Sequence, residues 1–162
     1  WELSPIAAAA HGLDATILFR RPNIEAADRA IERIRAVNLG TLVPAGRDAP
    51  LKLAQALKNG QHVAMLVDQY LTNGVPVTFF GRKTTANLLL ARLRRQTDCP
   101  IHGTRTFRPP ARRSRGEGPG EVKPVFASSG QIDIPGTLQA ISHIRQCWVR
   151  AHPSNRRQLP TA

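Results

Sequence analysis

Three groups of charged residues follow short apolar segments that we predict to be strands. These groups are Arg20 and Arg21 after 15–19, Arg47 and Asp48 shortly after 41–43, and Asp68 directly after 62–67. Ligands of open parallel sheets bind beyond the carboxyl ends of the strands. The carboxylate at position 68 is therefore either a structural cap of the loop that follows or a group placed in a cleft. Spacing alone does not choose between the two.

Several common catalytic and metal-binding patterns are absent from the sequence. It has no Gly-x-Ser-x-Gly motif, its histidines do not follow the spacing of metal ligands, and neither Cys99 nor Cys147 lies near a second soft ligand. The segment 40–46 begins and ends in glycine but lacks the Lys-Ser/Thr of a phosphate-binding loop. We therefore expect no metal ion and no cofactor.

Segments typical of strands and of helices alternate at the spacing of βαβ units. Apolar residues at helical spacing predict helices over 3–11, 23–39, 51–58, 86–95 and 135–151, with Asn23 and Asp48 as N-caps. Strands are predicted at 15–19, 41–43, 62–67, 100–107 and 122–126, and loops at 69–80 and 109–120. The expected fold is α/β, with a mostly parallel central sheet flanked by helices.

The positive charge is concentrated in the second half of the chain. The 162 residues carry a net charge of +12, with 8 Lys and Arg against 7 Asp and Glu in 1–81, and 15 against 4 in 82–162. Such asymmetry indicates an anionic partner. No run approaches the roughly 18 apolar residues of a membrane-spanning helix. The basic stretch 105–115 has one interleaved aromatic and no predicted helix, so a solvated loop explains it better than a nucleic-acid interface.

Four motifs occur together, and they resemble one known family. They are Trp1-Glu2, Phe19-Arg20-Arg21-Pro22-Asn23, Leu66-Val67-Asp68-Gln69 and Phe79-Phe80-Gly81-Arg82. In this order they resemble the bacterial lipid A biosynthesis lauroyl/myristoyl acyltransferase family, a branch of the lysophospholipid acyltransferase superfamily. The resemblance implies a partial acyltransferase-like domain over 1–152, truncated at its N-terminus, and a disordered or degenerate tail at 153–162.

The resemblance also implies a reaction and its partners. It predicts transfer of a fatty acyl chain from acyl carrier protein to a hydroxyl of a lipid A precursor or other membrane lipid, at the cytoplasmic face of the bacterial inner membrane. An anionic membrane surface is then a partner, and no nucleic acid is expected. Two alternatives stay open: a non-catalytic relative that binds acyl carrier protein or lipid, and a basic nucleic-acid-binding domain that charge alone favours.

Site residues follow from the same motifs. Glu2 matches the catalytic carboxylate of a motif in which a histidine lies five positions before Asp or Glu. Arg21, Asn23, Asp68 and Arg82 match positions expected to bind substrate or support the site, with Arg21 suited to a phosphate or oxyanion and Arg82 to a phosphate-bearing headgroup.

The motif histidine would lie ahead of Trp1. None of the chain's five histidines is followed five positions later by an acidic residue. A positioned general base contributes roughly 10²–10⁴-fold in rate. The resemblance therefore predicts that this chain, as given, is inactive or nearly so.

Overall fold

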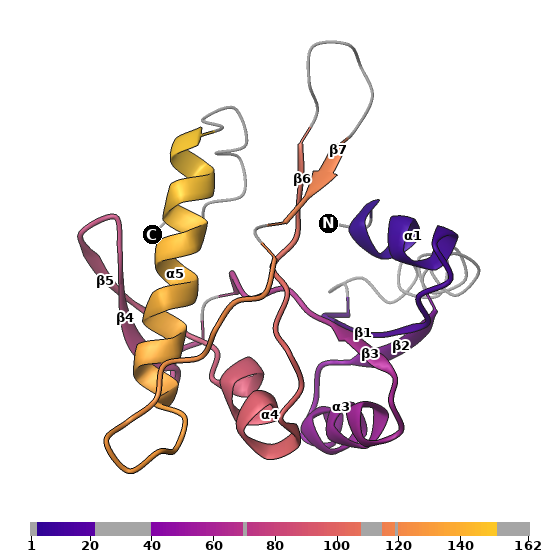
Figure 1. Cartoon of the computed structure of the whole chain (residues 1–162), viewed down its shortest axis with the longest axis horizontal. Coiled ribbons are helices and arrows are strands. Elements are labelled where there is room, and N and C mark those ends of the chain that lie inside the picture. Colours follow the sequence, from indigo (N-terminus) through magenta and orange to yellow (C-terminus); the bar gives the residue numbers. More distant parts are fainter. Residues whose placement is uncertain (1–2, 22–39, 70, 108–114, 119, 152–162) are drawn as a thin grey trace. The chain divides into compact units, whose positions relative to one another are not determined.

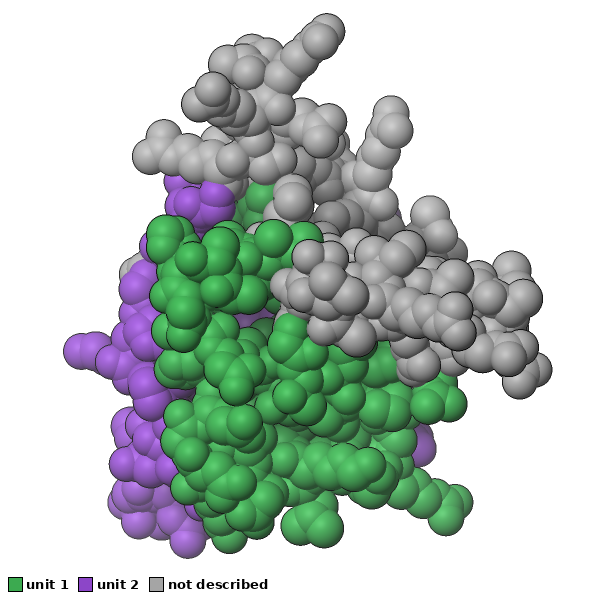
Figure 2. Space-filling view, turned by 90° about the vertical axis from the view of Figure 1, so that its right-hand side faces the viewer, with its two compact units in different colours: residues 1–66, 104–106 green, residues 67–103, 107–162 purple. Residues whose placement is uncertain are grey.

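A computed structural model describes residues 3–21, 40–69, 71–107, 115–118 and 120–151. The predicted helix 23–39, its proposed cap Asn23, the Trp1-Glu2 motif and the tail 153–162 lie outside the described residues. The chain divides into two compact units, which Figure 2 colours separately. Unit 1 comprises residues 1–66 with 104–106, and unit 2 comprises 67–103 with 107–162.

Unit 1 contains a three-stranded parallel sheet in the order β2-β1-β3 (Figure 1). The strands are β1 (Ala15–Phe19), β2 (Thr41–Pro44) and β3 (His62–Ala64). Side chains of Ala15 and Ile17 are buried and pack against Leu42 and Ala64. The first two strands confirm the prediction from sequence.

The third strand is shorter than predicted. The apolar run 62–67 was expected to form a strand buried on both faces, but β3 ends at Ala64. His62 is exposed, and Val63 and Ala64 are only half-buried. Among the described strands, β3 pairs only with β1, so it lies at the edge of this sheet, and this position explains why its side chains are not fully buried.

Two helices of unit 1 begin and end near their predicted positions. Helix α1 (Leu3–Ala10) is followed by Gly12 at φ +77°, where the N–H of Leu13 reaches back to the carbonyl of Ala8 at 3.0 Å. The Ser4 hydroxyl lies 2.9 Å from the hydroxyl of Thr106, which ties the segment 104–106 to this helix. The predicted helix 3–11 is thus confirmed, and a glycine in the left-handed conformation follows its end.

Helix α3 (Ala49–Lys58) contacts all three strands of the parallel sheet, and its Leu53 is completely buried. Asp48 occupies the N-cap position as predicted, but its side chain makes no capping hydrogen bond. Its carboxylate instead pairs with Lys52 at 2.6 Å, one helical turn later. The Asp48 carboxylate thus binds the Lys52 ammonium group and not the backbone N–H groups at the start of the helix.

Unit 2 contains an antiparallel hairpin where a loop was predicted. Strands β4 (Val75–Phe79) and β5 (Arg82–Ala86) pair from Val75 with Ala86 to Phe79 with Arg82. The loop prediction for 69–80 is therefore wrong over β4. Pro76 within the segment suggested a break, but proline is tolerated in strands that have a free edge. Ala86, expected to start the next helix, is the last residue of β5.

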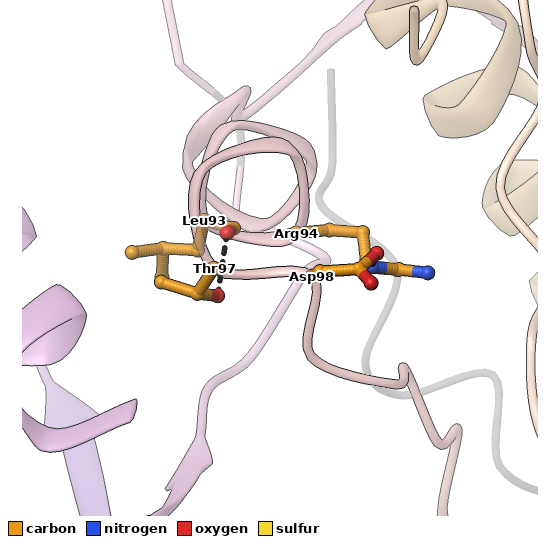
Figure 3. Close-up of polar contacts among 4 residues, drawn as sticks. All are labelled: Leu93, Arg94, Thr97 and Asp98. Atoms are coloured by element: carbon orange, nitrogen blue, oxygen red, sulfur yellow. Dashed lines mark hydrogen bonds and ion pairs between the residues drawn. The ribbon is translucent and has the colours of Figure 1, made fainter. Parts of the chain in front are cut away.

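Helix α4 (Leu89–Thr97) ends in two local interactions that Figure 3 shows. The Thr97 hydroxyl donates to the carbonyl of Leu93 at 2.8 Å, while the guanidinium of Arg94 pairs with the Asp98 carboxylate. Asp98 adopts φ +54°, the left-handed conformation that stops helices. The predicted helix 86–95 is thus confirmed as an element, shifted by about three residues toward the C-terminus.

Helix α5 (Ile134–Ala151) confirms the predicted helix 135–151 and forms the core of unit 2. Leu138 packs with Val77, Ala86 and Ala91, and Ile141 packs with a second buried group formed by Ile101 and Val122.

The same helix binds the free edge of β4. Gln139 accepts the N–H of Thr78 at 2.8 Å and donates to its carbonyl at 3.0 Å, and Gln146 lies 3.4 Å from the same oxygen. The side-chain amide of Gln139 therefore makes the two hydrogen bonds that the backbone of a neighbouring strand would make.

The remaining described segments differ from prediction in three places. Strand β6 (Arg105–Phe107) covers only the end of the predicted strand 100–107. Strand β7 (Arg115–Glu117) lies in the stretch 109–120, which was expected not to pack. The predicted strand 122–126 does not form: pairing in this region is limited to the Val122 N–H, which bonds to the Ile101 carbonyl at 2.7 Å, and to an isolated bridge between Phe126 and Ile132.

The mixture of helices and strands around a three-stranded parallel sheet agrees with the predicted α/β class. The antiparallel β4–β5 pair forms a separate two-stranded sheet outside this parallel sheet. The likeness to an acyltransferase fold stays a prediction.

Candidate functional site

Three of the five predicted site residues lie in the described part of the chain. Arg21 is exposed two residues after β1, Asp68 is half-buried four residues after β3, and Arg82 is the exposed first residue of β5. Glu2 and Asn23 lie outside the described residues. Arg21 belongs to unit 1, whereas Asp68 and Arg82 belong to unit 2. The structure thus gives a local environment for each of the three.

Arg21 lies just beyond the carboxyl end of the central strand of the parallel sheet. The N–H of Ala45 donates to the Phe19 carbonyl at 2.8 Å, which continues the β1–β2 pairing up to the last residue of β1. The backbone leading to Arg21 is therefore fixed by hydrogen bonds until two residues before it. This is the edge of an open parallel sheet at which ligands generally bind.

Asp68 interacts electrostatically with Arg145 of α5. Burial of the Arg145 guanidinium lowers its pKa, because a low-dielectric environment disfavours the charged form, and the nearby Asp68 carboxylate opposes this shift. The observed neighbour of Asp68 is a cation, and this favours a charge-balancing role over a loop cap.

The Phe79-Phe80-Gly81-Arg82 motif forms the turn of the β4–β5 hairpin, and we call these four residues the hairpin tip. Phe80 and Gly81 have φ values of +51° and +76°, the combination that a two-residue type I′ turn requires. Glycine adopts such values freely, whereas a left-handed conformation costs other residues roughly 1–2 kcal/mol. Gly81 is thus explained by the turn, but Phe80 is not.

Two arginines of α5 stack on the two aromatic rings of the hairpin tip. The guanidinium carbon of Arg145 lies 5.0 Å from the centroid of the Phe79 ring, and that of Arg150 lies 5.4 Å from the centroid of Phe80. The rings themselves meet edge to face, with centroids 4.9 Å apart and an interplanar angle of 85°. These cation–π and aromatic contacts hold the tip against the C-terminal half of α5.

The hairpin and α5 carry only positive formal charge. Their sequences contain Arg82, Lys83, Arg145 and Arg150 but no Asp or Glu. A guanidinium stacked on a ring keeps its N–H donors at its edge, and these suit phosphate or carboxylate oxygens. The arrangement is therefore able to bind anionic groups next to an aromatic surface.

Arg145 and Arg150 were not predicted from the sequence. Within 134–151 they lie among apolar residues at helical spacing, which indicated a core helix and nothing more. Their partners Phe79 and Phe80 are far away in the sequence. To predict them, one would have to know that the two consecutive aromatic residues contact arginines of a distant helix. A single sequence carries no signal of such a contact.

The model of the bacterial lipid A biosynthesis acyltransferase family matches residues 1–155 of the chain. The chain belongs to this family. Comparison with curated proteins gives no match. Members of the lipid A acyltransferase family join an acyl donor to a lipid substrate, and the motifs around Arg21, Asp68 and Arg82 all lie within the matched residues.

Two further observations concern the described part of this acyltransferase-family chain. Among those residues, no helix combines the length and apolar character needed to cross a membrane. The same residues contain no group of three or more His, Cys, Asp or Glu side chains arranged to hold a metal ion.

Proposed function

We propose that this chain takes part in the transfer of a fatty acyl group from acyl carrier protein to a hydroxyl of a lipid A precursor, at the cytoplasmic face of the bacterial inner membrane. The observation that carries the proposal is the family match over residues 1–155. The cationic hairpin and helix α5 support it, because lipid A precursors bear phosphate groups and acyl carrier proteins are acidic.

The reaction requires a base, a carboxylate and donors for an oxyanion. The acceptor oxygen attacks the thioester carbonyl carbon while a base takes its proton, and the carbon–sulfur bond then breaks as the proton passes to the departing thiolate. Glu2 is the carboxylate that would hold the tautomer of an imidazole base and stabilise its charged form. Arg21 would stabilise the oxyanion or bind a substrate phosphate, with Asn23 beside it in the sequence.

In unit 2, Asp68 and Arg82 have different roles in this proposal. Asp68 balances the charge of Arg145, which stacks on the hairpin tip, so it acts through the position of another residue. Arg82 is exposed at the first position of β5 and is free to meet a phosphate directly. Removal of Asp68 should therefore reduce stability and substrate binding together, whereas removal of Arg82 should reduce substrate binding without a loss of stability.

The first test measures transfer of a radiolabelled acyl chain from acyl carrier protein to a lipid A precursor by the 162-residue chain. Because none of its histidines has an acidic residue five positions later, we expect background transfer in plain buffer. Imidazole in the buffer should raise the rate, since it supplies the base. Glu2→Gln and Arg21→Ala should each reduce this rescued rate.

Binding of the precursor, measured by calorimetry, serves as the second readout. Arg82→Gln should weaken it, and Arg95→Gln on α4, an exposed arginine outside the motifs, is the matched control. Transfer without imidazole would show that the predicted inactivity is wrong. Neither rescued transfer nor precursor binding would overturn the proposed function.

A further inference from the structure

The hairpin tip exposes an aromatic residue in a strained backbone conformation. Phe80 is 38% exposed and has a positive φ, at a turn position where Asn, Asp or Gly is usual. Strain of this kind persists where surrounding contacts impose it, and it is concentrated at functional sites. Arg150 and Phe79 supply those contacts here. The turn therefore presents an aromatic ring to solvent although a small polar residue would fit better.

Exposure by itself does not distinguish Phe80 from other apolar residues of the surface. Phe126 is more exposed, at 59%, but it lies at the opposite end of α5. There the carbonyl of the preceding residue, Val125, accepts the N–H of Asp133, just before the helix begins. Leu51 is 74% exposed and lies beside the neutralised pair of Asp48 and Lys52. Of the two phenylalanines, Phe80 is the one for which the described residues show a cation over the ring, namely Arg150.

The cations around Phe80 come from both elements that form this surface. Arg82 and Lys83 are exposed at the start of β5, and Arg150 is exposed near the end of α5. The strands of the hairpin and α5 contain no carboxylate, and the charge of Asp68 acts on the half-buried Arg145. No carboxylate of the β4–β5 strands or α5 therefore neutralises Arg82, Lys83 and Arg150.

We propose that the hairpin tip, with Lys83 and Arg150, is a docking surface for an anionic lipid bilayer. The ring of Phe80 enters the headgroup region, and Arg82, Lys83 and Arg150 contact lipid phosphates from around it. An aromatic ring bordered by basic side chains is typical of proteins that bind at this interface. The proposal rests on the proposed function only in that a lipid acceptor brings the chain to a membrane.

Other anionic partners fit this surface less well. Single-stranded nucleic acid requires open aromatic faces on which bases stack, but Arg150 lies over the Phe80 ring and Phe79 meets that ring edge to face, so only part of the ring reaches solvent. An acidic protein would be attracted by the charges but would not require an exposed phenylalanine at a strained turn. A bilayer uses both features.

Flotation with lipid vesicles tests the proposal on the full 162-residue chain. Vesicles of phosphatidylglycerol in phosphatidylcholine should bind the chain, and pure phosphatidylcholine should not. Each basic residue near an anionic surface contributes about fivefold to partitioning. The Arg82→Gln/Lys83→Gln double variant should therefore bind roughly 25-fold more weakly. The double variant Arg92→Gln/Arg95→Gln, with the same charge change on exposed residues of α4, is the matched control and should bind more tightly than the hairpin variant.

The aromatic contribution is tested with Phe80→Asn. Asparagine tolerates the positive φ of the turn, so this variant should keep its circular dichroism spectrum while its partitioning falls several-fold. Phe126→Asn removes a more exposed ring at the other end of α5 and should leave binding unchanged.

Equal losses for the hairpin and α4 double variants, or for the two phenylalanine variants, would overturn the proposal. Binding to an acidic protein without binding to vesicles would do the same. These vesicles contain neither acyl donor nor acceptor. A failure of binding therefore leaves the transfer reaction untouched, and a failure of transfer leaves the docking surface untouched.

Discussion

Replacement of Gln139 by alanine should loosen the β4–β5 hairpin from α5. In an antiparallel pair, every second residue points its N–H and C=O away from the partner strand, and Thr78 is such a residue because both its groups bond to Gln139. The two hydrogen bonds measure 2.8 and 3.0 Å. The variant removes both while it keeps a residue that favours helix.

The expected loss follows from these two bonds. A neutral hydrogen bond contributes about 0.5–1.5 kcal/mol net, so the pair contributes about 1–3 kcal/mol. Thr78 is exposed, and water can therefore replace the lost partner, which places the expected loss in the lower half of that range. Unfolding temperatures of domains this size shift by about 2–4 °C per kcal/mol. We expect a decrease of about 2–8 °C.

Urea and thermal unfolding of Gln139→Ala, compared with Gln96→Ala, provide the assay. Gln96 is an exposed glutamine of α4, so its replacement should change stability by no more than a few tenths of a kcal/mol. If the two variants lose the same small amount, the amide of Gln139 does not hold the hairpin and the reasoning is refuted.

Three further predictions concern unit 1. Gly40→Ala should lower the free energy of unfolding, measured in urea, by about 1–3 kcal/mol. Gly40 has φ +79°, and an added Cβ would lie 2.6 Å from the carbonyl oxygen of Ala15, the first residue of β1. Unchanged stability would contradict this backbone geometry. Lys52→Gln should raise the pKa of Asp48 toward 3.8 in an NMR titration, since the hydrogen bond and charge of Lys52 lower it; an unmoved titration would mean that the pair does not form in solution. Leu53→Ala should cost about 2–5 kcal/mol because this side chain is fully buried, whereas the 74% exposed Leu51 should tolerate the same change, and similar losses would contradict the orientation of α3.

The sequence predicted correctly those strands and helices whose apolar residues are the ones buried in the structure. The run 15–19 is buried along most of its length in the centre of a sheet, and 134–151 has a wide apolar stripe that faces the core of unit 2. The hairpin was missed because Pro76 suggested a break, although Val75, Val77 and Phe79 alternate with more exposed residues as in a strand with one buried face. Its buried face packs against α5, which lies far along the chain.

The candidate site was predictable only in part, for a related reason. Motifs identify Asp68 and Arg82 because each is part of a short local pattern. The charge partner of Asp68 and the cation on Phe80 come from α5, and only tertiary structure brings them there. Residue types that are common on helix surfaces, such as arginine, give no local signal of a distant aromatic partner.

The return of residues 104–106 to unit 1 affects the order in which the chain can fold during its synthesis. The segment lies beside α1, where the hydroxyls of Ser4 and Thr106 meet. Residues 67–103, which belong to unit 2, are translated before this segment. Unit 1 therefore cannot be completed on the ribosome until residues 67–103 of unit 2 have been synthesised. In a nascent chain that ends at Leu66, unit 1 would lack the segment 104–106 that packs beside α1.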